Sequence, residues 1–185
     1  MIFIIRWLPD MWDSSGKDNE KTIQELLSNK DFDLVIMNIA AHIQMPPLPG
    51  QLQKYMTFLE KISSFYDKNF KVEKSERKMV PLLWKTMNPH YPEKKPPIYR
   101  FQTTLLSNIY NDISYYTLGE ASIPIINFSS MMKNGFPWTS RDGIHSSKFV
   151  DIMKNQILLN YLCNFGDFNT DFLLGEGYKN KVRGI

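Results

Sequence analysis

An acid and a histidine stand three residues apart in Asp142-Gly143-Ile144-His145, directly ahead of an apolar segment. This spacing allows the Asp142 carboxylate to reach one ring nitrogen of His145, which sets the tautomer and leaves the other nitrogen to act as a general base. A simpler interpretation is that Asp142 caps the following helix and His145 is exposed in its first turn. The catalytic interpretation therefore depends on the elements that precede these residues.

The apolar pattern predicts strands and helices that alternate along the chain. Strands are expected at 2–7, 33–38, 78–84 and 123–128, and helices near 20–28, 51–66, 99–117 and 146–163. Residues 34–37 are four consecutive apolar residues, which is typical of a strand buried on both faces of a parallel sheet. Strands that alternate with helices in this way predict an α/β fold with a parallel sheet.

All three histidines of the chain follow a predicted strand. His42 comes after the second strand, His90 after the third and His145 after the fourth. The carboxyl ends of parallel strands form the ligand crevice, so we expect the histidines on one rim. No local ligand pair such as His-x-x-x-His is present, and we predict no metal site. His90 has the alternative of lying in a rigid surface turn, because Pro89 and Pro92 flank it.

Composition and charge indicate an ordinary globular domain. The chain has 185 residues, 43% of them hydrophobic and 22% charged, with a net charge of +3. The basic residues are dispersed, so no nucleic-acid surface is expected. The single cysteine, Cys163, lies in an apolar segment and is expected to be a buried thiol. The apolar run at 2–7 is too short for a signal peptide or a membrane span, and its position at the very start suggests a truncated chain.

The order of these motifs resembles that of the SGNH (GDSL-like) hydrolase superfamily, and within it the neurexophilin and PC-esterase domain group. The resemblance covers residues 2–164 and is most specific in the closing segment. The blocks that carry it are Ala40-Ala41-His42-Ile43, Trp84-Lys85-Thr86-Met87-Asn88-Pro89-His90, Asp142-x-x-His145, Lys154-Asn155-Gln156-Ile157 and Leu159-Asn160-Tyr161-Leu162-Cys163. It implies a three-layer α/β/α fold with a flavodoxin-like parallel sheet, and a place in the secretory pathway.

The resemblance also implies an O-acyl esterase or acyltransferase that acts on glycan or lipid esters without a cofactor. In a Ser-His-Asp triad, His145 would be the general base and Asp142 would orient it. The oxyanion or substrate-binding group would comprise Asn38, Ala41 and His42. His42 stands where the superfamily commonly has an oxyanion-hole Asn, and a neutral imidazole can donate one N–H there. Asn38 would anchor this loop, while His42 has the alternative of a plain loop residue.

The nucleophile block departs from the superfamily pattern. No Gly-Asp-Ser triplet occurs in the chain, and the nearest imitation, Asp13-Ser14-Ser15-Gly16, follows a strand that resembles the family's second. We therefore expect residues 1–164 to form an SGNH-like domain without its first strand and nucleophile block, followed by a tail at 165–185. Such a chain would be inactive as an esterase. The alternative is a noncatalytic member of the same fold that binds a glycan or a protein.

Overall fold

The computed structural model describes residues 17–29, 31–32, 34–38, 50–70, 79–133, 139–140 and 142–164. Within these ranges the chain is a mixed α/β fold built on a small parallel sheet. Its strands are β1 (Val35–Met37), β2 (Leu82–Lys85) and β3 (Ile125–Ile126), in the order β1-β2-β3. β2 is central, and its residue Trp84 is opposite Met37 of β1 and Ile125 of β3.

Helices connect and flank these strands, as the apolar pattern predicts. The helices are α1 (Lys17–Ser28), α3 (Gln51–Phe70), α4 (Thr104–Glu120), α5 (Ser129–Lys133) and α6 (Lys148–Asn164), with short 3-10 turns η2 (Pro92–Lys94) and η3 (Pro97–Tyr99). The predicted α/β class and its parallel strands are confirmed. The strand predicted at 2–7 lies outside the described residues. No described helix is long and apolar enough to cross a membrane.

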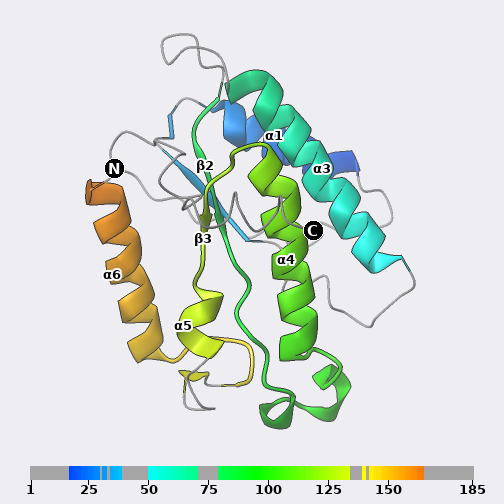
Figure 1. Ribbon diagram of the computed structural model, residues 1–185, viewed down its shortest axis with the longest axis vertical. Helices are drawn as coiled ribbons and strands as arrows, with labels where there is room; N and C mark the ends of the chain where they lie inside the picture. Colours follow the sequence, from blue (N-terminus) through cyan, green and yellow to red (C-terminus); the bar gives the residue numbers. More distant parts are fainter. Residues whose placement is uncertain are drawn as a thin grey trace, which may run out of the picture.

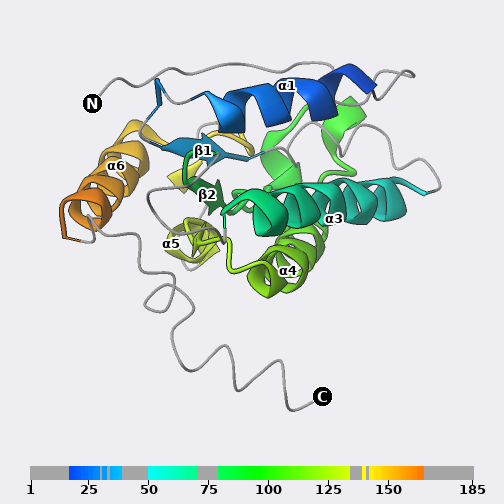
Figure 2. The same cartoon turned by 90° about the horizontal axis from the view of Figure 1, so that it is seen from above.

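One face of the sheet packs against the pair α3 and α4, with α1 at its border (Figures 1 and 2). Leu82 and Trp84 of β2 are fully or almost fully buried in this core. Tyr55 of α3 meets Tyr110 of α4 edge to face, with ring centroids 4.8 Å apart, and its hydroxyl lies 2.6 Å from the Ser114 hydroxyl. The polar tip of a buried tyrosine is thus satisfied inside the helix pair.

The opposite face of the sheet packs against α6. Leu83 of β2, Ile126 of β3 and Phe128 contact a stripe of α6 that includes Leu158 and Tyr161. This stripe continues one turn at a time through Val150 and Lys154, which are also buried. The loop that carries Asp142 and His145 directly precedes α6, which begins at Lys148.

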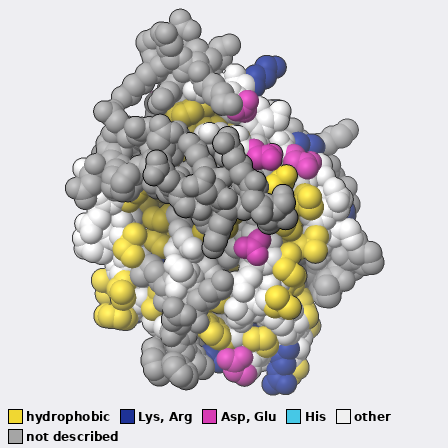
Figure 3. Space-filling model, in the orientation of Figure 1, with side chains coloured by type: hydrophobic (Ala, Val, Ile, Leu, Met, Phe, Trp, Pro, Cys, Tyr) yellow, Lys and Arg dark blue, Asp and Glu magenta, His cyan; other side chains and the backbone are white. Residues whose placement is uncertain are grey.

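The outer side of α6 is apolar as well. Phe149 is 71% exposed and Ile152 is 57% exposed, and hydrophobic side chains show in the region of α6 in Figure 3. Cys163 is exposed too, so the expectation of a buried thiol is wrong. Apolar residues lie on both the buried and the exposed sides of α6, so an apolar neighbourhood in the sequence does not tell which side of the helix faces the sheet.

Candidate active site

The segment from Thr139 to Ser147 closes on itself before α6 begins. Ser140 and Ser146 form an antiparallel bridge, so the chain between them is a tight loop. The Ser140 hydroxyl, whose residue is 2% exposed, fills this loop: it donates to the carbonyl of His145 (2.9 Å) and accepts from the amide of Gly143 (2.9 Å). The backbone around Asp142 and His145 is therefore held from inside.

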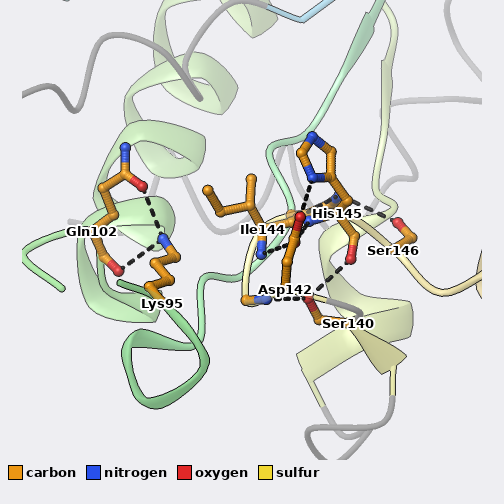
Figure 4. A network of polar contacts seen from close by, with 9 residues as sticks. Lys95, Gln102, Ser140, Asp142, Ile144, His145 and Ser146 are labelled. Atoms are coloured by element: carbon orange, nitrogen blue, oxygen red, sulfur yellow. Dashed lines mark hydrogen bonds and ion pairs between the residues drawn. The ribbon is translucent and has the colours of Figure 1, made fainter. Parts of the chain in front are cut away.

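The Asp142 and His145 side chains meet as predicted. Nδ1 of His145 lies 2.6 Å from Oδ2 of Asp142 (Figure 4). Because an ionised carboxylate only accepts, Nδ1 is the donor, and in the neutral ring Nε2 is the nitrogen with the free lone pair. The His145 side chain is 76% exposed, and within the described residues nothing is hydrogen-bonded to Nε2. That this nitrogen faces a binding pocket stays a prediction.

Asp142 does not cap α6. Its second oxygen, Oδ1, accepts from the amides of Ile144 (3.0 Å) and His145 (2.8 Å), and both residues precede the helix, which starts at Lys148. The carboxylate thus has one oxygen for the backbone and one for the imidazole. The capping interpretation of these residues is wrong, because the acid orders its own loop instead.

These contacts keep Asp142 ionised. Partial burial raises the pKa of its carboxyl, but the hydrogen bonds from the His145 ring and from the amides of His145 and Ile144 outweigh burial and lower the pKa to about 2. A carboxylate that stays charged at neutral pH can stabilise an imidazolium that forms beside it.

Asp142 should therefore titrate in a low pH window. Its folded pKa of about 2 lies below the usual value of 3.8. The carboxylate consequently stabilises the folded loop above pH 3.8, and this contribution is lost as the pH falls through about 2. Carboxyl carbon NMR should show this titration, and His145→Ala should raise the Asp142 pKa. An unshifted Asp142 in the wild-type chain would contradict the contact.

Gly143 lets this loop approach the segment after β2. The Tyr91 amide donates to the Gly143 carbonyl over 2.9 Å, and Gly143 has a φ of +85°, which L side chains rarely adopt. A Cβ at this position would stand 2.5 Å from the Tyr91 carbonyl oxygen. Glycine is therefore required both for the backbone conformation and for the close approach.

The segment after β2 is positioned by α4. Asn111 of α4 accepts from the Met87 amide (2.7 Å) and donates to the Met87 carbonyl (3.0 Å), as a neighbouring strand would do. The Thr86 hydroxyl accepts from the amide of Ser129, the first residue of α5, over 2.9 Å. The residues that follow β2 are thereby linked to both α4 and α5.

Asn38 is the only member of the predicted oxyanion group that the described residues include. Its side-chain amide donates to the Lys85 carbonyl over 2.7 Å, which joins the ends of β1 and β2. The predicted roles of Asn38, as an anchor for His42 and as part of the oxyanion group, stay predictions. Ala41 and His42 lie outside the described residues.

His90 lies beside the loop of Asp142 and His145, because the amide of the next residue, Tyr91, donates to the Gly143 carbonyl. It is fully buried, and both ring nitrogens are without a hydrogen-bond partner among the described residues. Burial, and after it the electrostatic effects of Lys95 and His145, lower the pKa of His90 to about 3 against the opposite effect of Asp142, so the ring is neutral. Its carbonyl accepts from the Thr104 hydroxyl (2.6 Å) at the start of α4. The alternative of a surface turn is therefore wrong, and the burial of the ring was not predicted.

Two buried lysines near the loop are not among the predicted site residues. Lys95 donates to the carbonyl (3.2 Å) and to Oε1 (2.9 Å) of Gln102, and burial lowers its pKa to about 8. Figure 4 shows this pair on the far side of Ile144 from Ser146. Lys154 of α6 is the second. In the sequence, Lys154 stands out as a charged residue within the otherwise apolar stripe of Val150, Leu158 and Tyr161.

The described residues hold no group of three or more His, Cys, Asp or Glu side chains that could bind a metal ion. No family model matches the chain, and no curated protein sequence matches it. The chemistry of the candidate site must therefore be argued from its geometry.

Proposed function

We propose that Asp142 and His145 are the acid and base of a Ser-His-Asp triad in an O-acyl esterase or acyltransferase of the SGNH type. The substrates would be acylated glycans or lipids, and the fold would be the three-layer α/β/α arrangement of that superfamily. The observation that carries the proposal is the 2.6 Å contact between Nδ1 and Oδ2, made by a carboxylate whose other oxygen is held by two amides. If the Asp142 carboxylate served only to order its loop, the two amide hydrogen bonds would be enough and the contact with the His145 imidazole would not be needed.

The geometry supports a general-base role for His145. Nε2 would take the proton of an attacking hydroxyl, and Asp142 would stabilise the resulting imidazolium without accepting the proton itself. Nε2 would then return the proton to the leaving alcohol. Asn38 directly follows β1 and donates to the Lys85 carbonyl, and in this proposal Asn38, Ala41 and His42 would supply the oxyanion site.

The nucleophile is the missing part. Ser140 and Ser146 lie in the same loop as His145, but the hydroxyl of Ser140 bonds the loop backbone and that of Ser146 contacts Lys154. Neither contacts the His145 ring. Because the chain has no Gly-Asp-Ser triplet, it is proposed to be inactive by itself. The absence of this triplet also favours the second candidate function, a noncatalytic domain that binds a glycan or a protein.

Ester hydrolysis separates the two functions. The chain as it stands should not hydrolyse p-nitrophenyl acetate above background. A chain extended upstream by a strand, a Gly-Asp-Ser turn and a helix should hydrolyse it measurably. If the unextended chain turns over ester and loses activity on Ser14→Ala or Ser15→Ala, the nucleophile is in that loop. An inert extended chain that folds would favour the binding function.

A further inference from the structure

Lys154 carries a charge into the contact between α6 and the end of β2. The residue is 6% exposed, and its ammonium donates to Oδ1 of Asn88 over 2.7 Å and to the hydroxyl of Ser146. It also approaches the sulfur of Met132 (3.3 Å) and lies 5.9 Å from the centre of the Phe128 ring. Each N–H of the ammonium thus has an acceptor.

The partners of Lys154 lie on both sides of His145. The side-chain amide of Asn88 donates to the hydroxyl of Ser146 (3.3 Å) and approaches the carbonyl of Ile144 (3.4 Å). Lys154, Asn88 and Ser146 therefore form a closed triangle of hydrogen bonds. Ser146 directly follows His145 in the sequence, and Asn88 contacts Ile144, which directly precedes it.

We propose that Lys154 is a positioning residue for His145: through Asn88 and Ser146 it fixes the backbone on both sides of the imidazole. The inference rests on the proposed function of the Asp142 and His145 pair, and extends that site to an element that the triad does not include. The imidazole itself is exposed, so packing around the ring cannot orient it. Its orientation must come from the backbone that carries it and from Asp142.

The charge on Lys154 argues against a purely structural role. Burying an ammonium is costly, and an apolar side chain of the same length would pack against Phe128 and Met132 without that cost. Burial, and then the nearby charge of Lys85, lower the pKa of Lys154 to about 8, against the opposite effect of Asp151. The side chain is still mainly charged at pH 7. A methionine at this position could not donate the hydrogen bonds that Lys154 makes to Asn88 and Ser146.

A serine bound to a lysine could also be a nucleophile and its base. Here the contacts oppose that role, because the Ser146 hydroxyl faces two N–H donors and Lys154 has an acceptor for each of its protons. A base would need a neutral amine that accepts from the hydroxyl. The arrangement holds the serine in place instead of activating it.

NMR of the chain as it exists tests the positioning role without any ester turnover. In the wild-type protein the Nδ1 proton of His145 should resonate at low field, because it is held by the Asp142 carboxylate. Lys154→Met should broaden or remove this resonance and raise the Asp142 pKa from about 2 toward 3.8. Lys148→Met, at the exposed start of the same helix, removes an equal charge and should change neither signal.

Ser146→Ala is the second variant, and it decides the matter if Lys154→Met does not fold. It deletes the shared corner of the triangle without placing a new group in the core, and it should also weaken the low-field resonance. A folded Lys154→Met protein with both signals unchanged would overturn the proposal, as would an unchanged Ser146→Ala protein where Lys154→Met is unfolded. Since neither signal depends on a nucleophile, failure of the esterase experiments would leave this result independent.

Discussion

His145→Ala should abolish ester hydrolysis in a chain that carries an upstream Gly-Asp-Ser segment. Without the imidazole no group takes the proton of the attacking hydroxyl, and the remaining triad members do not work separately. Loss of one such member lowers turnover on the order of a millionfold in enzymes of this kind. The measurement is kcat/KM for p-nitrophenyl acetate in the extended chain with and without the substitution.

Asp142→Asn provides a second, graded variant. An asparagine can still accept the amides of Ile144 and His145, so the loop should persist, but it no longer favours the tautomer with the proton on Nδ1. The comparable change in serine proteases lowers kcat about ten thousandfold. Asp112→Asn, which changes an exposed carboxylate on α4, is the matched control and should leave turnover unchanged. If the extended chain kept full activity with His145→Ala, the enzymatic proposal would be wrong.

Gly143→Ala should be among the most destabilising single changes in the chain. The new Cβ would stand 2.5 Å from the Tyr91 carbonyl oxygen and 2.9 Å from Cγ of Lys95, and a backbone oxygen cannot move aside as a side chain can. The positive φ adds strain of its own. Together these effects should lower the free energy of unfolding by about 3 kcal/mol, as measured by urea denaturation.

Two other glycines separate strain from crowding. Gly50 has a φ of +84° but nothing within 4 Å of an added Cβ, so Gly50→Ala should cost only the backbone term, about 1 to 2 kcal/mol. Gly119 lies in α4 with open space around it, and Gly119→Ala should stabilise the protein by up to about 1 kcal/mol. If Gly143→Ala cost no more than Gly50→Ala, the tight packing of the loop on Tyr91 would be refuted.

Most of the secondary structure could be predicted because it follows from periodicity. The apolar run before Asn38 and the spacing in Gln51–Phe70 gave a strand and a helix at the right places. The strands are shorter than predicted: β1 ends at Met37, and the side chain of the next residue, Asn38, donates to the Lys85 carbonyl. α5 escaped prediction, since five residues are too few to show a helical period.

The candidate site was predictable only where its contacts are local. Asp142 and His145 are three residues apart, so their spacing carries the geometry. The burial of His90 was not predicted, and the contact of its carbonyl with Thr104 joins residues 14 apart in the sequence. The partners of Lys154 are 66 residues away at Asn88 and 22 away at Met132, and no local pattern records them.

The Asn111 bridge to Met87 links α4, through the segment after β2, to the loop that carries His145. The two peptide groups of Met87 can find their partner only after α4 has docked, because that partner is a side chain 24 residues further along the chain. The same segment includes Tyr91, whose amide donates to the Gly143 carbonyl. Gly143 belongs to the loop that carries His145. Any local opening that loosens α4 should therefore also loosen the loop that carries Asp142 and His145.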